Sequence, residues 1–518
     1  MLLHELYKEA LASCPDKTAV VCGNKSCTYR ELDQSSALYA RALGALGVGR
    51  SDLVGIFSTN SLEIVRLYLA CFRIGAVAVP ISCYSRAPEI VYAIGHSGLR
   101  FFLFSRDLEP EVRELRREVP SLEAFLVIDG PAGETAESWA AVVRQAAASD
   151  SIPAPIVEES DPAVILYTSG STDKPKGVTH THGSLSQGAV NRCATLRHGS
   201  GHVFLAATQL CHAAAITNAL FPMFLSGGTS VFLSHWNTEE FLEAIGRYRV
   251  THAAFLPSQV AALLAHPQAP SARYDSLEYC QAGGDVVPRA LQELFRQTTG
   301  VELSQTLGMT ECNGFMTTSP FEQMKIGSLG KPLQGTDVRL VDQAGQDVSR
   351  GMPGEILIRG GAVTAGYWND PESTARAFTD GWLHTGDIAR QDEDGYYYFI
   401  GRAKEMIIRG GGNVGPGEVE DTLCEHPAVR RCGVFGVPDG RGGEMIHALV
   451  LLDKSRVPQP TAQDLALFAH LNLSERKVPE LWTFVDALPV TAAGKIDRKA
   501  LRPLAERLRN STIRLDRT

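Results

Sequence analysis

Cysteine pairs, long apolar runs and an excess of positive charge are all missing from this sequence. No two of its 11 cysteines have CxxC spacing, so the cysteine pattern suggests neither a zinc site nor a redox motif. No apolar stretch reaches the roughly 18 residues of a membrane span; Arg73 interrupts the run from Leu67 to Val79. The net charge of -9 argues against a nucleic-acid partner, which usually meets a basic face. The first residues lack an apolar signal core, so we expect a cytoplasmic protein without integral membrane contact.

The composition that remains is that of an ordinary globular protein. The chain has 518 residues, 44% hydrophobic and 21% charged, and no internal repeat. Domains usually hold roughly 100–200 residues, so we expect two to four units. Strand-like and helix-like segments alternate in the first half, which predicts an α/β protein with a largely parallel sheet and helices on its faces. The expected strands are 53–57, 77–81, 164–167, 203–206 and 253–256, and the expected helices are 61–74 and one capped by Thr28 with Glu31 at capping-box distance.

The character of the chain changes near residue 400. Residues 401–420 contain six glycines, and a helix and short alternating strands follow. We therefore expect a large N-terminal domain of layered sheets and helices over 1–402 and a small α+β domain over 403–518.

Residues 167–177, which read YTSGSTDKPKG, form a loop that suits phosphate. The loop follows an apolar strand and contains two glycines, four hydroxyl side chains and two lysines. Small residues let backbone N–H groups approach phosphate oxygens, hydroxyls add donors and lysine adds charge. A Walker A pattern is absent. The alternative is a flexible polar turn.

This loop closely resembles the phosphate-binding signature of the acyl-adenylate-forming superfamily, which includes acyl-CoA synthetases, adenylation domains of peptide synthetases, and luciferases. The usual pattern is close to TSGTTGxPKG; here Ser171 replaces a threonine and Asp173 a glycine. Three further blocks match in the family's order: GMTE at 308–311, GWLHTGDIARQDEDGYYYFIGR at 381–402, and PVTAAGKIDRK at 489–499. The resemblance extends over nearly the whole chain.

The resemblance implies an ATP site. Glu311 would hold Mg²⁺ against the phosphates, Thr310 would lie near the α-phosphate, and Asp387 and Arg402 would contact the ribose. The implied nucleotide-binding residues are Thr168, Ser169, Gly170, Ser171, Thr172, Lys176, Gly284, Leu307, Gly308, Met309, Asp387 and Arg402. Leu307 stands where the family usually stacks an aromatic residue on adenine. The alternatives are a capping or surface role for Glu311 and a structural ion pair for Asp387 or Arg402.

The resemblance also implies a catalytic lysine and a hinge. Lys495 would bridge the substrate carboxylate and the α-phosphate, two anions that a cation brings together, with His212 and Thr310 also in the catalytic centre. Lys404 falls at the hinge of a mobile C-terminal domain, and Gly410, Gly411 and Gly412 line the thiol tunnel. The family more often has Glu at 412 and Tyr at 415; Gly412 and Gly415 predict a wider tunnel or a more mobile loop.

Residues 208–217, TQLCHAAAIT, predict an apolar acyl pocket. In the family the residue after His212 pairs with the ammonium of amino-acid substrates when it is Asp. Here it is Ala213, and a buried unpaired ammonium is costly, which disfavours α-amino acids. The implied pocket residues are His212, Ala213, Phe255, Gly283 and Gly308, which suit a fatty, aryl or polycyclic acid. Asp285 could face a polar substituent, and a core histidine is the alternative for His212.

These features together predict a carboxylate–CoA ligase that works as a monomer or homodimer. Acid and ATP give an acyl-adenylate and pyrophosphate, and a thiol then displaces AMP; the cofactors are ATP, Mg²⁺ and coenzyme A. One rival is a stand-alone adenylation enzyme that loads the phosphopantetheine of an acyl carrier protein. Another is a catalytically weak binding protein, for which Asp173, Leu307 and Gly412 argue. The basic segment from Lys495 to Arg517 is either solvated or meets the phosphates of CoA or an acidic carrier protein.

Overall fold

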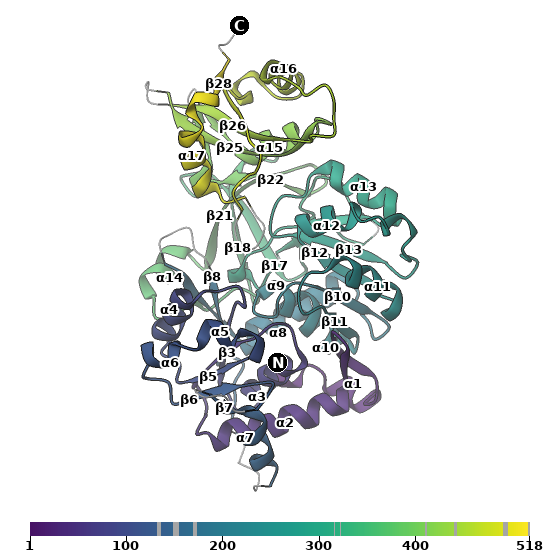
Figure 1. Cartoon of the computed structure of the whole chain (residues 1–518), viewed down its shortest axis with the longest axis vertical. Coiled ribbons are helices and arrows are strands. Elements are labelled where there is room, and N and C mark those ends of the chain that lie inside the picture. The colour runs from purple at the N-terminus through teal and green to yellow at the C-terminus, as the bar shows by residue number, and fades with distance from the viewer. Residues whose placement is uncertain are drawn as a thin grey trace.

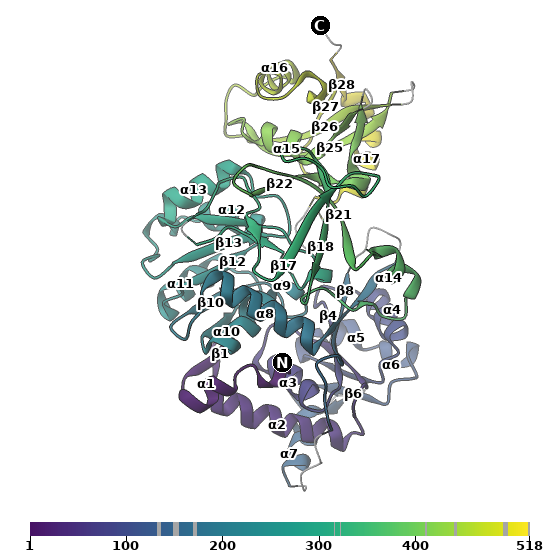
Figure 2. The same cartoon turned by 180° about the vertical axis from the view of Figure 1, so that it is seen from behind.

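The structure is a computed structural model. It describes residues 1–131, 136–148, 155–168, 174–314, 316–321, 323–409, 412–439, 443–490 and 496–515. Two large sheets with helices and a third, antiparallel sheet form most of the molecule, and the C-terminal strands and helices form a smaller unit at one end of its long axis (Figures 1 and 2). The predicted fold class, a large N-terminal α/β domain followed by a smaller C-terminal domain, is confirmed. Within the described residues, no helix is both long enough and apolar enough to cross a membrane.

The first large sheet has eight strands and begins with the predicted ones. Its order is β19-β9-β8-β4-β3-β5-β6-β7, and strands β3 to β7 run parallel. The strands are β3 (Leu53–Phe57), β4 (Val77–Ile81), β5 (Phe101–Phe104), β6 (Ala124–Val127), β7 (Glu137–Ser138), β8 (Pro162–Thr168), β9 (Lys176–Thr181) and β19 (Gly366–Tyr367). Helices α2 (Tyr29–Ala45) and α3 (Leu62–Arg73) pack on each other beside it. The predicted capping box is present, since Thr28 accepts from the N–H of Glu31 and Glu31 accepts from that of Thr28.

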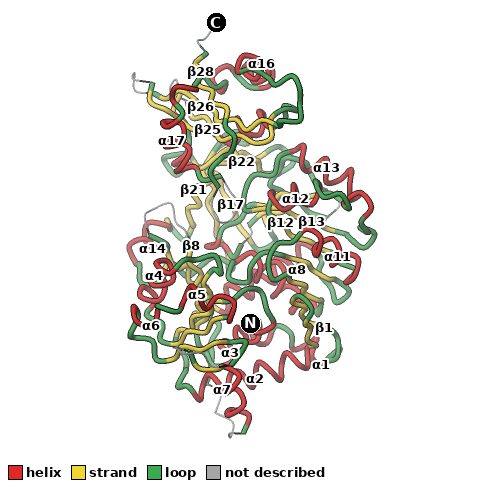
Figure 3. Tube along the Cα trace, in the orientation of Figure 1, coloured by secondary structure: helices red, strands yellow, loops and turns green. Residues whose placement is uncertain are grey.

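The second large sheet has seven strands in the order β14-β13-β12-β10-β11-β1-β2, and all neighbours but the last pair are parallel. The strands are β1 (Thr18–Cys22), β2 (Lys25–Thr28), β10 (Val203–Ala206), β11 (Thr229–Phe232), β12 (His252–Phe255), β13 (Tyr279–Gly283) and β14 (Leu303–Thr306). On one face lie α11 (Thr238–Tyr248), α12 (Pro257–Leu264) and α13 (Arg289–Thr299). On the other face, α8 (His182–Leu196) and α10 (Phe221–Ser226) share a core with α3 and the first sheet. Figure 3 shows these strands in yellow between the red helices.

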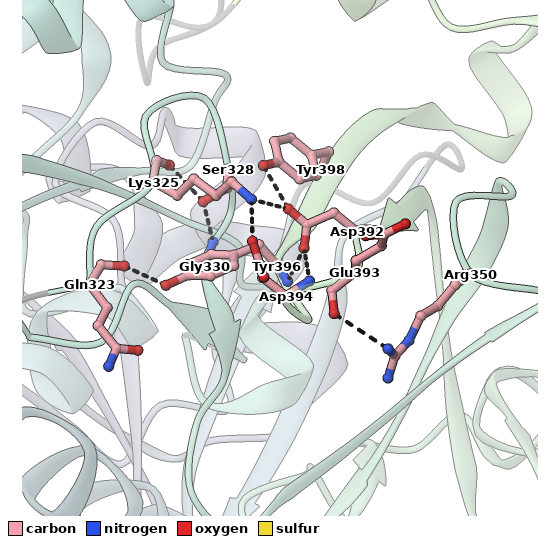
Figure 4. Close-up of polar contacts among 10 residues, drawn as sticks. All are labelled: Gln323, Lys325, Ser328, Gly330, Arg350, Asp392, Glu393, Asp394, Tyr396 and Tyr398. Atoms are coloured by element: carbon pink, nitrogen blue, oxygen red, sulfur yellow. Dashed lines mark hydrogen bonds and ion pairs between the residues drawn. The ribbon is translucent and has the colours of Figure 1, made fainter.

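The antiparallel sheet connects the large domain to the small one. It contains β17 (Thr336–Val341), β18 (Gly354–Gly360), β20 (Phe378–Thr379), β21 (Trp382–Gln391) and β22 (Tyr397–Arg402). The turn between β21 and β22 is anchored by Lys325, whose Nζ lies 2.5 Å from Asp392 Oδ2 and 3.0 Å from Asp394 Oδ2 (Figure 4). Asp392 Oδ2 also accepts from the hydroxyl of Tyr398 at 3.0 Å, and the hydroxyl of Tyr396 donates to the Gln323 carbonyl at 2.6 Å. These contacts hold the hairpin that carries two predicted ribose-binding residues.

The small C-terminal unit has its own sheet and its own core. The sheet contains β25 (Val429–Pro438), β26 (Glu444–Leu452), β27 (Leu481–Phe484) and β28 (Ile513–Arg514). Helices α15 (Pro416–Cys424), α16 (Ala462–Asn472) and α17 (Arg498–Arg507) pack around it, and Trp482 is fully buried within it. The short segments η6 (Ala403–Glu405), β23 (Ile407–Arg409) and β24 (Gly412–Val414) lie between β22 and this unit. The exact boundary after residue 402 stays a prediction.

Candidate nucleotide and acyl site

The carboxyl ends of four parallel strands in the second large sheet gather many of the predicted site residues. In register, Ala206 faces Ala254, Phe255 faces Ala282, and Gly283 faces Thr306. The segments that follow these strands contain His212, Gly284 and Leu307, so they emerge at one edge of the sheet. In open α/β sheets, ligands bind outside the carboxyl ends of the strands. Gly284 has φ +85°, a left-handed conformation that favours glycine.

The GMTE segment turns sharply after β14. Leu307 forms an isolated bridge with Thr317, and Met309 N–H contacts the Cys312 sulfur at 3.3 Å. The residues from Thr310 to Cys312 then form a short 3₁₀ turn, and the side chain of Glu311 is buried, with only 8% of the residue exposed. Its burial excludes the alternative that Glu311 is a surface glutamate.

Two strands far apart in the sequence bring Lys176 and Tyr367 to Glu311. Strand β9 begins at Lys176 and pairs with β19, where Tyr367 faces Val178. The hydroxyl of Tyr367 donates to Glu311 Oε1 at 2.8 Å, and Lys176 Nζ lies 4.6 Å from the centroid of the Tyr367 ring. The predicted metal ligand and the lysine of the glycine-rich loop are therefore joined through one tyrosine ring.

His180 fixes the backbone beside the carboxylate. Its Nε2 lies 2.8 Å from the Thr310 carbonyl, and its Nδ1 lies 3.1 Å from the Ser184 hydroxyl. Burial lowers the pKa of His180 to about 4, so the ring is neutral at neutral pH. The neutral ring donates from Nε2 to the carbonyl and accepts at Nδ1, which holds the Thr310 backbone in place.

Asp387 and Arg402 pair with each other across β21 and β22. They are opposite residues in the ladder, and Arg402 Nε lies 3.3 Å from Asp387 Oδ1. Asp387 is 5% exposed, whereas the side chain of Arg402 is about half exposed. The ion-pair alternative is thus present in the structure. It is compatible with ribose binding, because a carboxylate has about four acceptor sites and one ion pair occupies only part of them.

The predicted acyl segment forms a short helix beside the GMTE turn. His212 precedes α9 (Ala213–Ala215) and is exposed, so the core-histidine alternative for this residue is wrong. Ala213 is buried. Gly314 has φ +88°, and a Cβ at this position would lie 2.6 Å from the Thr217 hydroxyl and 3.4 Å from Ala214. This close approach seats α9 against the turn that contains Glu311. The chain continues as a single π-helical turn, η3 (Ile216–Leu220), a feature frequent at functional sites.

Two residues expected near the acyl group point elsewhere. The Phe255 ring is buried against Phe241 and Phe295, with centroids 5.0 Å and 5.7 Å away, so only its backbone lies at the strand end. Strand alternation explains this, because it aims Phe255 at the helices on the outer face. Asp285 accepts from the N–H of Val286 at 2.9 Å and lies 3.9 Å from Arg431 of the small domain. It faces the other domain.

The predicted hinge lies at the junction of the domains. Lys404 is exposed within η6, and partial desolvation together with the Arg402 charge lowers its pKa. Gly412 begins β24 and pairs with Arg409. A Cβ at Gly415 would lie 1.9 Å from the Ile400 carbonyl oxygen, so the absence of a side chain at 415 permits the contact between α15 and β22.

Several predicted residues lie outside the described part of the chain. They are Ser169, Gly170, Ser171, Thr172, Asp173, Gly410, Gly411 and Lys495. Thr168, the last residue of β8, pairs with Lys176 and marks where the glycine-rich loop leaves the first sheet.

Tyr367 and His180 were not predicted from the sequence. The signal for Tyr367 was an aromatic pair, Tyr367–Trp368, directly after Gly366 and between two matched blocks. His180 had no signal, because its contact with Thr310 joins residues 130 positions apart.

Comparisons with known proteins find similar proteins over nearly the whole chain. The model of the family described as AMP-binding enzyme matches residues 7–368, and that of the AMP-binding enzyme C-terminal domain matches 418–495. A feruloyl-CoA synthase of an Amycolatopsis species is 37% identical over 491 residues, which cover 94% of this chain and 96% of that protein. A medium/long-chain-fatty-acid–CoA ligase of Mycobacterium tuberculosis is 33% identical over 95% of this chain and 88% of its own length. The crystal structure of an anthranilate CoA ligase in complex with anthranoyl-AMP superposes with a TM-score of 0.92 at 28% identity, covering 98% of both chains. The chain belongs to the AMP-binding enzyme family.

Proposed function

We propose that the protein is an ATP-dependent acid–CoA ligase. It activates a carboxylic acid as the acyl-adenylate and then transfers the acyl group to coenzyme A. The observation that carries this proposal is the buried Glu311 carboxylate, held by Tyr367 beside Lys176 at the carboxyl edge of the sheet. Relatives named as CoA ligases for feruloyl and fatty acyl groups support it.

The nucleotide end of the site fits ATP with Mg²⁺. Among the described residues, no lysine or arginine lies within ion-pair distance of Glu311, although its carboxylate is buried. A hard oxygen ligand in such surroundings suits a divalent cation, which would neutralise charge on the leaving pyrophosphate. Asp387 and Arg402 would bind the ribose, and Lys176 would face the phosphates.

The acid end of the site suits an apolar acid. Ala213, with Ala214 and the flanking glycines 283 and 308, offers no charge to pair with an α-ammonium group. The carboxylate oxygen of the acid attacks the α-phosphorus of ATP; the new P–O bond forms as the bond to pyrophosphate breaks. His212, exposed beside this pocket, would border the carboxylate.

The second half-reaction requires the small domain to move. The thiol sulfur attacks the acyl carbon, AMP leaves with the bonding electron pair, and the thiol proton passes to solvent. Lys495 would serve the first step and Gly412 the second, with rotation about Lys404 exchanging them. The PVTAAGK block and the hinge position support this assignment.

ATP–pyrophosphate exchange over a panel of acids tests the proposal. The panel should contain hydroxycinnamic, benzoic, fatty and α-amino acids, each assayed afterwards for thioester with CoA and with a phosphopantetheinylated carrier protein. We expect exchange with apolar acids, none with α-amino acids, and thioester formation with CoA. Exchange without a CoA thioester would replace the ligase by a carrier-loading enzyme, and no exchange with any acid would leave a binding protein.

A further inference from the structure

Three histidines meet at the amino ends of the second large sheet, at the edge opposite the ATP and acyl site. His198 follows α8, His202 precedes β10, and His252 is the first residue of β12. One ring nitrogen from each lies within 4.8 Å of the others. Nothing in the proposed ligase reaction uses these side chains.

Buried ring nitrogens in this cluster have no partner among the described residues. His252 is 1% exposed, and its Nδ1 lies 2.9 Å from the Thr251 hydroxyl while its Nε2 has no hydrogen bond. Both ring nitrogens of His198 are also without one. An unsatisfied buried polar atom costs free energy, so each such atom calls for an explanation. A metal ion would supply a partner for these lone pairs.

His202 and Glu278 complete the cluster on its solvent side. His202 Nε2 lies 3.4 Å from Glu278 Oε2, and the Glu278 side chain is about half exposed just before β13. The Gly199 N–H donates to His202 Nδ1 at 2.9 Å. Because Nδ1 accepts this hydrogen bond, the ring proton is on Nε2. Coordination through Nε2 would move that proton to Nδ1 and release the hydrogen bond, and at this half-buried position water can replace it.

Burial keeps two of the rings in the form that binds metal. Burial lowers the pKa of His252 to about 3 and that of His198 well below its usual range, with the nearby Arg192 guanidinium adding to both shifts. Both rings are therefore neutral at neutral pH, and neutral imidazole is the form that binds metal. Arg192 opposes a second positive charge, and the negative charge of the Glu278 carboxylate beside His202 offsets it.

We propose that these three imidazoles, with Glu278 as the fourth ligand, bind one zinc ion. Three nitrogens and one carboxylate oxygen are a zinc ligand set, and four protein ligands make a closed, structural site. Binding would require the three nitrogens, which lie within 4.8 Å of one another, and the Glu278 carboxylate to close to the roughly 2.0–2.1 Å bond length of zinc. The ion would tie the α8–β10 connection to the starts of β12 and β13, whose far ends border the acyl pocket.

Cobalt(II) titration of the untagged, chelator-treated protein tests this site. Tetrahedral cobalt gives visible absorption bands, and zinc should displace it at one equivalent per chain. We expect no thiolate charge-transfer band, since no cysteine takes part, and no effect of Mg²⁺. His252→Gln and the exposed Glu278→Gln should each weaken cobalt binding by at least ~10-fold, since even outer-shell partners contribute roughly 10–100-fold. His235→Gln, at an exposed histidine outside the cluster, should bind as the unaltered protein does.

Zinc should also raise the melting temperature of the unaltered protein, because it binds only the folded chain, and should not raise that of Glu278→Gln to the same extent. Glu278 lies at the surface, so its variant folds even where His252→Gln does not. Equal cobalt affinity in the unaltered protein and Glu278→Gln, or thiolate bands in the cobalt spectrum, would overturn the proposal. Activity with ATP and acid is not the readout, so failure of this site leaves the ligase proposal untouched.

Discussion

At the residue scale, variants of Glu311 and Tyr367 separate the effect of the Glu311 charge from the effect of its positioning by Tyr367. Glu311→Gln removes the carboxylate charge and should lower ATP–pyrophosphate exchange by roughly 10²–10³-fold while raising the Mg²⁺ concentration needed for half-maximal rate. Tyr367→Phe keeps the ring beside Lys176 and the carboxylate charge, so a smaller loss, about 10-fold, is expected. Steady-state exchange across a Mg²⁺ series measures both. Normal kinetics of Glu311→Gln at low Mg²⁺ would remove Glu311 from the metal site.

Ala213 tests the acyl pocket. Ala213→Asp puts a carboxylate at the buried first position of α9, where it would lie next to the apolar part of the substrate. Activation of the native acid should fall at least about 10-fold in kcat/KM, because a charge in an apolar site is costly. Ala213→Val, which adds bulk without charge, is the matched control. If the Asp variant activates the same acid normally, residue 213 does not line the pocket.

At the element scale, Gly415 determines how closely α15 approaches β22. Gly415→Ala would place a Cβ 1.9 Å from the Ile400 carbonyl oxygen, so the strand and helix must separate. We expect a loss of stability of about 1–3 kcal/mol, the usual cost of overpacking, seen as a lower melting temperature. Gly417→Ala is the control, because its nearest new contact would be an ordinary 3.8 Å. Equal melting temperatures of the two variants would show that α15 and β22 can separate without a loss of stability.

Element prediction succeeded where the signal was local. Strands 53–57, 77–81 and 203–206 match β3, β4 and β10, and the helix of 61–74 matches α3 with Ser61 as its cap. Periodicity and capping are properties of adjacent residues, so one segment suffices to show them.

Prediction failed where the outcome depended on distant contacts. The family resemblance implies Phe255 as pocket lining, but its ring packs against Phe241 of α11 and Phe295 of α13. For Gly415 the sequence predicts a wider tunnel or a more mobile loop, and it gives no sign of the Ile400 carbonyl oxygen that lies 1.9 Å from a Cβ built there. Tyr367 reaches Glu311 only because β19 pairs with β9 across almost 190 residues of sequence.

At the scale of the whole molecule, the pKa of Asp421 depends on charges from both domains. Asp421 lies on α15. Burial and the nearby Glu420 and Glu425 charges raise its pKa to about 7. From the large domain, the Arg289 charge lowers this pKa and the Asp285 charge raises it. Because the pKa is raised in the folded state, the contribution of this carboxyl to the free energy of unfolding is fully present below its unfolded pKa of 3.8. It is lost as the pH rises toward 7. Asp421→Asn should therefore melt at a higher temperature than the unaltered protein at pH 8, with the difference vanishing near pH 4.

An aspartate with the opposite shift provides the control. Asp486 is exposed and its pKa is lowered by Lys454, so Asp486→Asn should bring no gain at pH 8. A melting difference for Asp421→Asn that does not change between pH 4 and pH 8 would show that burial does not raise the pKa of its carboxyl.

Two variants separate the half-reactions. Lys495→Ala should lower adenylation by at least ~10²-fold, the scale of one lost electrostatic donor, and leave thioester formation from supplied acyl-adenylate largely intact. Lys404→Pro fixes φ at the hinge, so adenylation should persist while thioester formation slows. Single-turnover kinetics of each step in each variant are the measurement. Equal loss of both steps in both variants, with unchanged melting curves, would rule out the rotating-domain mechanism.

The position of β1 in the second large sheet delays the pairing of this strand while the chain is being synthesised. This strand, Thr18–Cys22, leaves the ribosome well before its parallel partner β11, which is Thr229–Phe232. At roughly 5–20 residues per second, the separation of about 200 residues corresponds to ~10–40 s of synthesis. During that time β2 is the one strand of its sheet that β1 can pair with, and a lone two-stranded hairpin is barely stable. An apolar strand edge of the nascent chain is therefore exposed to aggregation, and open to chaperones, before a single residue of the GMTE block has been translated.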